Sequence, residues 1–351
     1  MNKTESLFRR FESNQASWYD YSEFIQLPDE QLERFFDLSY KIKLNNLGTL
    51  LKIYIPDDRF PAISITGDQC ELSCEHCNEK YLKGMEPLTT NSDLYHYLIN
   101  HAKNGGVGAL ISGGCLSDGS VPLYEYLDTI KKIKKETNLI INAHTGLLNE
   151  ETARKLSDAN VDIVSFDINI DPEIIQNIYH LDKSIEDYQK SIRLLQKYNL
   201  NVIPHICIGL HYGELAKELD CIKFIKEIDM DPSLIVFIAL IPPKNSHMKF
   251  KTPSILDISK IIALTRFIFP NKEISLGCMR PRGTLRQSLE KAAIKAGINR
   301  LEMPSRYTLK WLYKNYPQIK LKFFSSCCAI KIEDEIKSTM KDTKIKKYLR
   351  I

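Results

Sequence analysis

Short apolar segments rich in β-branched residues alternate with amphipathic segments along most of the chain. The apolar segments predict eight strands, at 62–66, 108–112, 138–144, 161–168, 201–209, 233–240, 272–277 and 298–303. The amphipathic runs between them, such as 123–136, 184–198 and 255–268, predict helices. A repeated strand–helix pattern is typical of a parallel sheet. The sequence therefore predicts an α/β fold, with a closed (β/α)8 barrel of the TIM type favoured over an open doubly wound sheet.

The two ends of the chain differ from this repeat. Residues 1–60 are predicted to form a helical N-terminal extension, because the run at 27–53 has helical periodicity. The barrel is expected over 61–305, and a C-terminal extension over 306–351. The charged tail at 331–351 predicts a solvated helix.

Composition narrows the class of protein further. Apolar residues make up 43% of the 351 residues, enough to build a full core. The 48 Lys and Arg residues oppose 44 Asp and Glu residues, and a net charge of +4 does not argue for nucleic-acid binding. The sequence shows no membrane-spanning run and no secretory signal, so a cytoplasmic protein is expected. In a reducing compartment, the nine cysteines are expected to be thiols or metal ligands rather than disulfides.

Three of these cysteines, Cys70, Cys74 and Cys77, directly follow the first predicted barrel strand. Chemistry in such barrels collects at the carboxyl ends of the strands. Three thiolates can ligate three irons of a [4Fe–4S] cluster and leave the fourth iron open. A structural zinc site prefers four ligands, and His76 is poorly placed as the fourth because it adjoins Cys77. Zinc binding and unligated thiols are the alternatives.

The segment CELSCEHC at 70–77 resembles the C-x3-C-x2-C signature of the radical S-adenosylmethionine (SAM) superfamily. His76 stands where an aromatic residue is usual. The resemblance implies that the three thiolates hold a [4Fe–4S] cluster whose open iron is chelated by the amino and carboxylate groups of SAM. It also implies that one electron from the cluster splits the sulfonium and gives a 5′-deoxyadenosyl radical, which removes a hydrogen atom from the substrate.

Further segments are similar to this family over about residues 60–305. Gly113 and Gly114 match the glycines of a Gly-Gly-Glu-Pro motif that approaches the methionyl amino group of SAM, with Cys115 in place of the Glu. Gly209 lies in a stretch similar to one that packs by the adenine. The run at 238–248 resembles a Pro-rich loop of the biotin synthase-like branch. The resemblance thus implies that all three glycines bind the cofactor.

Polar residues at other strand ends are also predicted to bind the cofactor. Asn142 and His144 end the third predicted strand, Asp167 ends the fourth, and Arg280 and Arg282 follow the seventh. The first three are expected to contact SAM or shape its pocket, and an arginine could bind its carboxylate bidentately. The alternative is a satisfied structural network, because unpaired charge inside a barrel is costly. No catalytic residue is predicted.

The remaining cysteines divide into two groups. Cys115 and Cys278 follow predicted strands, and Cys327 and Cys328 follow the barrel. These four are predicted to be metal ligands of a second, auxiliary [4Fe–4S] cluster, although adjacent thiolates are awkward on one cubane and only one of the tail pair is needed. Cys207 and Cys221 are expected to be ordinary cysteines.

An auxiliary cluster is the sulfur source in biotin synthase and lipoyl synthase. The chain looks like the archaeal-type two-protein lipoyl synthases, and this implies a sulfurtransferase that inserts sulfur into a protein-bound octanoyl chain in lipoate biosynthesis. The implied partners are SAM, a lipoyl carrier protein, a second radical SAM subunit and a reductant such as ferredoxin or flavodoxin. The Lys-rich tail is a candidate surface for the carrier.

Two other classes of function remain open. One is a radical SAM mutase or maturase, similar to methylornithine synthase or the hydrogenase maturases, without sulfur donation. The other is a scaffold that stores metal or binds zinc and does not cleave SAM.

Overall fold

The computed structural model describes residues 3–244, 246 and 248–349. Two compact units make up the chain. Unit 1 contains residues 1–53, 206–242 and 250–322, and unit 2 contains residues 54–205, 243–249 and 323–351.

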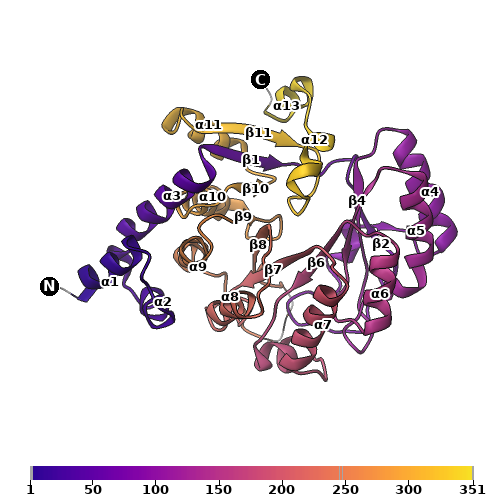
Figure 1. Ribbon diagram of the computed structural model, residues 1–351, viewed down its shortest axis with the longest axis horizontal. Coiled ribbons are helices and arrows are strands. Elements are labelled where there is room, and N and C mark those ends of the chain that lie inside the picture. The colour runs from indigo at the N-terminus through magenta and orange to yellow at the C-terminus, as the bar shows by residue number, and fades with distance from the viewer. Residues whose placement is uncertain (1–2, 245, 247, 350–351) are drawn as a thin grey trace. The chain divides into compact units, whose positions relative to one another are not determined.

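Unit 2 holds a parallel sheet with helices packed along it. The strands are β2 (Ala62–Ser64), β3 (Glu86–Pro87), β4 (Gly108–Ser112), β5 (Ile140–His144), β6 (Ile163–Asp167) and the first part of β7 (Val202–Ile208). Their order is β7-β6-β5-β4-β2-β3, and every pair is parallel. The helices are α4 (Asn91–Lys103), α5 (Leu127–Glu136), α6 (Glu150–Asp158) and α7 (Ile185–Lys197), and Figure 1 shows them side by side along these strands. The carboxyl ends of parallel strands meet at one edge, so the loops after β2, β4, β5 and β6 gather there.

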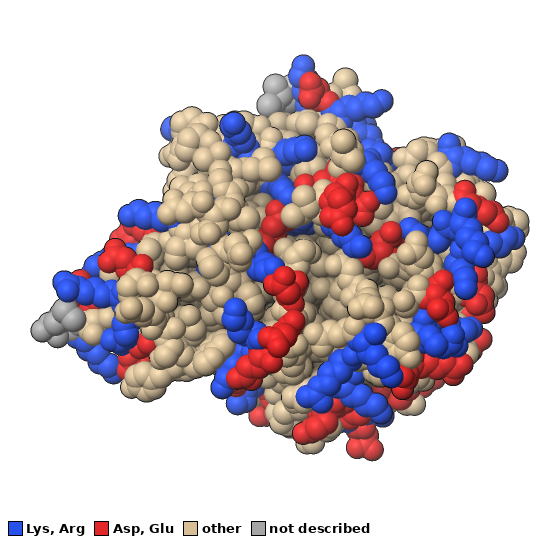
Figure 2. Space-filling view, viewed as in Figure 1, with Lys and Arg blue, Asp and Glu red and all other residues tan. Residues whose placement is uncertain are grey.

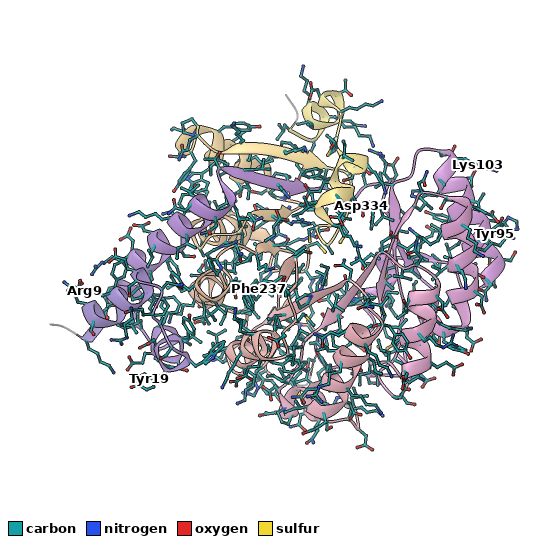
Figure 3. All side chains as sticks on the ribbon, viewed as in Figure 1. Arg9, Tyr19, Tyr95, Lys103, Phe237 and Asp334 are labelled. Atoms are coloured by element: carbon teal, nitrogen blue, oxygen red, sulfur yellow. The ribbon has the colours of Figure 1, made fainter. Side chains whose placement is uncertain are left out.

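Side chains on the outer helices of unit 2 hold neighbouring helices together. Tyr95 and Lys103 of α4 lie on the outer side of this layer (Figure 3). The Tyr95 hydroxyl donates to Glu136 of α5 at 2.6 Å, and the Lys132 ammonium lies 4.0 Å from the Tyr95 ring centroid. Such exposed contacts contribute little energy each, and the buried apolar faces of the helices supply most of the packing.

Unit 1 repeats the same alternation of strand and helix. Its strands are β1 (Leu50–Tyr54), β8 (Leu234–Ala239), β9 (Glu273–Leu276), β10 (Arg300–Glu302) and the first part of β11 (Lys320–Phe324), in the order β11-β1-β10-β9-β8. Its helices are α1 (Lys3–Glu12), α2 (Trp18–Ile25), α3 (Glu33–Leu47), α8 (Glu218–Glu227), α9 (Ile255–Ile268), α10 (Arg286–Lys295) and α11 (Arg306–Asn315). Phe237 of β8 is fully buried inside this unit (Figure 3).

An aromatic cluster fixes the N-terminal helices onto α9. Phe11, Phe24, Phe35 and Phe267 have ring centroids between 4.7 and 6.0 Å apart, mostly edge to face. Helix α9 is buried on every side from residue 258 to residue 268, which explains its nearly continuous apolar sequence. The N-terminal helices therefore belong to a hydrophobic core.

The strand predictions are confirmed. Each predicted strand contains an observed one, in chain order β2, β4, β5, β6, β7, β8, β9 and β10. The pairs described in each unit are parallel, so the α/β class is confirmed as well. The predicted division at residues 60 and 305 stays a prediction.

The prediction that all of residues 1–60 are helical is wrong at its end. Helix α3 stops at Gly48, whose φ of +67° lies in the left-handed region and whose N–H donates to the Leu44 carbonyl. The apolar residues that follow form β1, where the Lys52 N–H donates to the Asn299 carbonyl of the β10 segment at 2.9 Å. In the sequence, Gly48 within the periodic run at 27–53 was the signal that the helix ends there.

The C-terminal segment is also more structured than a solvated tail. It contains β11, α12 (Glu335–Ser338) and α13 (Asp342–Leu349). Within unit 2, Tyr54 stacks on Phe324 at 5.0 Å and donates its hydroxyl to Glu335 at 2.7 Å. Only α13 fits the expected solvated helix, since it has no buried residue, and Arg350 and Ile351 lie outside the described residues.

The charged side chains are mixed in sign on the face seen in Figure 2, where Lys and Arg alternate with Asp and Glu. This mixture fits the small net charge of the sequence. Among the described residues, no helix is long and apolar enough to cross a membrane.

Candidate cluster and cofactor site

The loop that carries Cys70, Cys74 and Cys77 begins directly after β2. Its second half is a tight turn, because the N–H groups of Cys77 and Asn78 both donate to the Cys74 carbonyl, at 3.1 and 2.9 Å. Asn78 and Glu79 then adopt positive φ values of 46° and 56°. This turn reverses the chain immediately after the third cysteine, so all three thiols stay in one compact loop.

The loop after β4 packs directly on the cysteine loop. The Gly114 N–H donates to the Thr66 hydroxyl at 2.7 Å. A Cβ added to Gly114 would lie 2.0 Å from the Gln69 carbonyl oxygen and 2.7 Å from the Cys70 Cβ. Only glycine permits this approach, which gives Gly114 a structural role at the predicted site. Gly113 is tighter than usual as well, with Thr66 3.0 Å from the position of a Cβ.

The next residue, Cys115, contacts the cysteine loop through its backbone. Its N–H donates to the Cys70 sulfur at 3.3 Å, and its carbonyl accepts from the Glu71 N–H at 2.8 Å. The Glu71 carboxylate in turn accepts from the Ser117 N–H at 2.7 Å. Cys115 therefore lies beside the first three cysteines.

These thiols lie in an environment that disfavours free thiolates. Burial raises the pKa of Cys74 far above its ordinary value, and the neighbouring thiols raise it further. Burial also raises the pKa of Cys77, partly offset by backbone N–H groups of residues 79–81. The pKa of Cys115 rises to about 12, mainly through burial and then through Cys70 and Asp167. Deprotonation here needs a bound cation, so the donor set fits an iron–sulfur cluster.

The distances between the cysteine sulfurs distinguish an iron–sulfur cluster site from a site for a single zinc ion. Sulfurs bound to one zinc at 2.3 Å lie about 3.8 Å apart. Among the described residues, no three of Cys70, Cys74, Cys77 and Cys115 have sulfurs all within 4.8 Å of one another. The arrangement therefore fits a group of several irons better than one zinc ion.

Glu75 anchors the middle of the cysteine loop. Its N–H donates to the Ile178 carbonyl at 2.8 Å, in the segment after β6. Its carboxylate lies 3.2 Å from the His180 ring nitrogen and accepts from the Ser246 hydroxyl at 2.9 Å. In the loop predicted at 238–248, Asn245 and His247 lie outside the described residues.

The ring of His76 lies 5.2 Å from that of Tyr179, and its Nδ1 atom is buried without a hydrogen-bond partner among the described residues. Burial lowers the pKa of His76 to about 4, so the imidazole is neutral at neutral pH. A buried neutral ring with an unpaired nitrogen suits contact with a polar aromatic ligand. At the position before the third cysteine, a histidine therefore stands in place of the usual aromatic residue.

His144 and Asp167, at the ends of β5 and β6, come together with His205 in the middle of β7. His144 Nε2 lies 3.2 Å from the Asp167 carboxylate, and the side chains are 31% and 48% exposed. Burial disfavours the charged form of each side chain, but the attraction and hydrogen bond between the two side chains have the larger effect. The pKa of Asp167 therefore falls to about 2, and that of His144 rises above its ordinary value. The two side chains therefore form an ion pair that remains open to a ligand.

His205 completes this group as a neutral imidazole. Its ring lies 5.7 Å from that of His144, and its Nδ1 donates to the Ile203 carbonyl at 3.0 Å. Burial, followed by the charge of His144, lowers its pKa to about 4. The sequence placed His205 on its strand but did not predict it as a site residue.

Asn142 is 1% exposed and accepts a hydrogen bond from the Ser165 hydroxyl at 3.0 Å. This bond supports the structural alternative for Asn142. Asn169, which was not predicted, is a better candidate for ligand contact. It is 5% exposed, and its Nδ2 has no partner among the described residues. No sequence pattern distinguished these two asparagines, because both follow or end an apolar strand.

Unit 1 contains the predicted residues Gly209, Cys278, Arg280 and Arg282. Gly209 has a φ of +74°, and a Cβ there would lie 2.3 Å from the Pro253 ring. Its N–H donates to Glu218 at 2.8 Å. The backbone conformation and this packing explain the glycine without a cofactor.

Arg280 is 2% exposed and lies in a buried polar network. It pairs with Glu290 at 2.7 Å and donates to the carbonyls of Gly277 and Glu302. Glu290 also accepts from the Thr308 hydroxyl at 2.6 Å. These contacts support the structural-network alternative for Arg280, although its buried Nε atom has no hydrogen-bond partner among the described residues. Arg282 is exposed and Cys278 is half-buried.

The C-terminal cysteines lie in unit 2. Cys328 is 1% exposed, and Cys327 is half-buried and accepts from the Ala329 N–H at 3.5 Å. Cys221 is buried on α8 in unit 1, as expected of an ordinary core cysteine, and Cys207 is half-buried. The ligand roles of Cys278, Cys327 and Cys328 stay predictions.

The fold and the thiol group define a parallel α/β protein with a candidate metallocluster site at the carboxyl ends of its strands. The sequence profile of the radical SAM superfamily matches residues 64–225. This segment spans the cysteine loop, the loop after β4 and the His144–Asp167 pair. The segment that carries the candidate site is therefore similar to the radical SAM superfamily.

Curated relatives are similar over most of the chain. The chain is 28% identical over 292 residues to a biotin synthase of Chlorobium phaeobacteroides (strain BS1), covering 79% of this chain and 82% of the relative. It is also 28% identical over 225 residues to a biotin synthase of Methanococcus aeolicus, covering 59% and 65%.

Two solved structures share the fold. The [FeFe]-hydrogenase maturase HydG from Carboxydothermus hydrogenoformans matches with a TM-score of 0.65 and 17% identity, over 86% of this chain and 70% of that one. Methylornithine synthase (PylB) matches with a TM-score of 0.59 and 17% identity, over 84% and 85%. The predicted α/β fold class, with parallel strands and helical extensions, is confirmed.

Proposed function

We propose that this chain is a radical SAM enzyme that inserts sulfur into an unactivated C–H bond, with a protein-bound octanoyl chain as its substrate. One observation carries the radical part of the proposal. The three cysteines after β2 are packed against the Gly113–Gly114 loop after β4, inside the segment that matches the family. When bound, the cluster and SAM would supply a 5′-deoxyadenosyl radical for hydrogen abstraction.

The residues of this chain would act by binding and orientation. Cys70, Cys74 and Cys77 would each ligate one iron, and the Gly114 contact keeps their loop in place. The His144–Asp167 pair would present one proton donor and one acceptor to the polar groups of SAM, since both side chains are partly exposed. The unpaired nitrogens of His76 and Asn169 are further candidates for hydrogen bonds to SAM or substrate.

Sulfur insertion is supported by the relatives named biotin synthase, which match most of the chain. The octanoyl substrate, the lipoyl carrier protein and a second radical SAM subunit are the finer part of the proposal. They rest on the resemblance to archaeal-type two-protein lipoyl synthases. The auxiliary cluster is part of this finer proposal, and Cys115, one of the cysteines predicted for it, lies beside the first cysteine loop.

The position of Cys115 also favours a second candidate function. If Cys115 belongs to the first cysteine loop, only three of the four cysteines proposed for the auxiliary cluster remain. A radical SAM mutase or maturase that donates no sulfur needs no such cluster, so this reaction class is the alternative.

The test is a product assay on the reconstituted protein under anaerobic conditions. SAM and dithionite are added with an octanoylated carrier peptide or, separately, with a biotin precursor. Sulfur insertion predicts 5′-deoxyadenosine together with a carrier peptide heavier by sulfur, and a control with all three loop cysteines changed to alanine forms neither. If 5′-deoxyadenosine forms without any sulfur-containing product from either substrate, the mutase or maturase class replaces sulfur insertion.

A further inference from the structure

Cys115 occupies an unusual place for a residue outside the three-cysteine signature. The end of β4 delivers it beside Cys70, where its N–H donates to the Cys70 sulfur at 3.3 Å. Gly113 and Gly114 precede it, and the Gly114 contact leaves no room for a side chain between the two loops. The loop after β4 thus brings a fourth thiol to the cysteine loop without any side chain in the way.

Glu71 holds the backbone that follows Cys115. Its N–H donates to the Cys115 carbonyl at 2.8 Å, and its carboxylate accepts from the Ser117 N–H at 2.7 Å. The Cys115 N–H is bound to Cys70 and its carbonyl to Glu71, so both backbone groups of Cys115 are tied to the cysteine loop. A thiol fixed in this way loses little conformational entropy when it binds a metal at the same loop.

From these contacts we propose that Cys115 is a displaceable fourth ligand, whose thiolate binds the iron left open by Cys70, Cys74 and Cys77 until SAM takes its place. The inference rests on the proposed radical SAM function. Thiolate is the ligand that irons of such clusters bind in proteins, so a fourth cysteine within reach competes with any other ligand.

The exchange involves no electron transfer. When Cys115 binds, its S–H proton passes to solvent and an Fe–S bond forms. When the amino and carboxylate groups of SAM bind, that Fe–S bond breaks and the thiolate takes a proton from solvent. The consequence is a cluster whose fourth iron is protected in the absence of SAM and exposed only when SAM is present.

Alkylation of the wild-type protein tests this directly. The cluster-loaded protein is treated with iodoacetamide, with and without SAM, and the tryptic peptide at 104–131, in which Cys115 is the only cysteine, is quantified by mass spectrometry. We expect slow alkylation of Cys115 without SAM and faster alkylation with it. An equal rate in both conditions, or a slower rate with SAM, would overturn the proposal.

Variants give a second, independent readout. In Cys115→Ala and Cys115→Ser, mild oxidation without SAM should release the open iron and give the EPR signal of a [3Fe–4S] cluster, whereas the wild type and the control Cys221→Ala should resist this loss. If Cys115 occupies the iron about nine-tenths of the time, the apparent Kd for SAM should fall about tenfold in Cys115→Ala, since it scales inversely with the competent fraction. A [3Fe–4S] signal of equal size in the wild type, with an unchanged Kd, would contradict the inference.

The two proposals fail in different ways. If the wild type binds no cluster at all, the proposed function fails. If it binds a cluster and cleaves SAM while Cys115 stays freely reactive throughout, the proposed function stands and only the role of Cys115 is lost.

Discussion

The segments that follow β4 and β9 look alike in sequence and differ in what their polar groups do. Each follows a parallel strand, and each places a cysteine near its start, Cys115 in unit 2 and Cys278 in unit 1. After β9, both terminal nitrogens of Arg280 bind Glu290 or backbone carbonyls inside a buried network, and only its Nε atom lacks a partner among the described residues. After β4, Cys115 joins the other half-buried thiols of the cysteine loop, and its own pKa is raised by burial and by its neighbours.

The difference shows that a place at the end of a strand is not sufficient to identify a site residue. A polar group whose bonding capacity is filled by protein stabilises the fold, whereas one left open is available to a ligand. The predictions below separate the two cases, beginning with the largest effect.

Loss of one loop cysteine should have the largest effect. In Cys70→Ala, Cys74→Ala or Cys77→Ala, each remaining pair of thiolates is too few to hold the cluster with one open iron. We expect cleavage of SAM to 5′-deoxyadenosine under dithionite to fall below detection, as measured by liquid chromatography. Cys221→Ala, a buried cysteine on α8, should retain full cleavage, and cleavage at the wild-type rate in any loop variant would refute the assignment.

Arg280→Ala should affect stability instead of cofactor chemistry. The variant removes one of the two arginines that pair with buried Glu290 and leaves Arg286 at 3.0 Å, so the loss should approach but not exceed the about 3–5 kcal/mol of a broken buried ion pair. Urea unfolding should therefore show a large loss of unfolding free energy, while Arg282→Ala, at an exposed site, should change it by about 0.5 kcal/mol or less. If Arg280→Ala unfolds like the wild type and loses affinity for SAM, then Arg280 is a ligand-binding residue. The segments after β4 and β9 would then not differ in the function of their polar groups.

Gly114→Ala tests the contact between the two loops. The added methyl group collides with the Gln69 carbonyl and Cys70, and overpacking of this kind costs about 1–3 kcal/mol. Because the strain falls on the cysteine loop, we expect a lower iron content after reconstitution. Gly84→Ala is the matched control, since a Cβ at Gly84 meets no atom within 4 Å. Equal iron content in both variants would show that the contact does not support the cluster.

Asp167→Asn should have a smaller effect, and one that depends on pH. Asp167 has a lowered pKa, so its contribution to stability is present above its unfolded value of about 3.9 and is lost as pH falls through about 2. His144 has a raised pKa, so its contribution is full below about 6.5 and is lost as pH rises through the folded value. The pair should therefore contribute most between about pH 4 and 6.5, by about 1 kcal/mol or less because both groups are partly exposed.

An NMR titration of the cluster-free protein measures this. In Asp167→Asn, burial acts on His144 without the carboxylate, and the pKa of His144 should drop below its ordinary value. A pKa that stays raised in the variant would mean that another group holds the imidazolium.

The smallest effect is expected from the lysines of α13. Lys344 already pairs with Asp57 at 2.9 Å, whereas Lys346 and Lys347 are exposed. If the helix helps to bind an acidic carrier protein, Lys346→Glu and Lys347→Glu should weaken that binding a fewfold at low salt, because exposed charges contribute little each. Calorimetry with the carrier would show this, and an unchanged affinity would remove α13 from the proposal.

Much of the fold and part of the candidate site were predictable from the sequence. Strand periods and the cysteine spacing are local, so the barrel strands and the loop at 70–77 could be predicted directly. The position of β1 was missed because its pairing with β10 is a long-range contact. The backbone contact of Cys115 with Cys70 was missed for the same reason, since residues 45 apart in sequence meet only in the folded sheet. The ion pair of Arg280 with Glu290 and the unpartnered nitrogens of His76 and Asn169 depend on neighbours that no local pattern specifies.

The most direct test of the account is an anaerobic count of iron and sulfide, with Mössbauer spectra, on the wild type and on the variant with alanine at Cys70, Cys74 and Cys77. The account predicts a [4Fe–4S] cluster of about four irons that is present in the wild type and lost from the variant. Irons that remain in the variant would report an independent auxiliary cluster and would strengthen sulfur insertion. A variant with the same iron content and spectrum as the wild type would contradict the assignment of the cysteine loop.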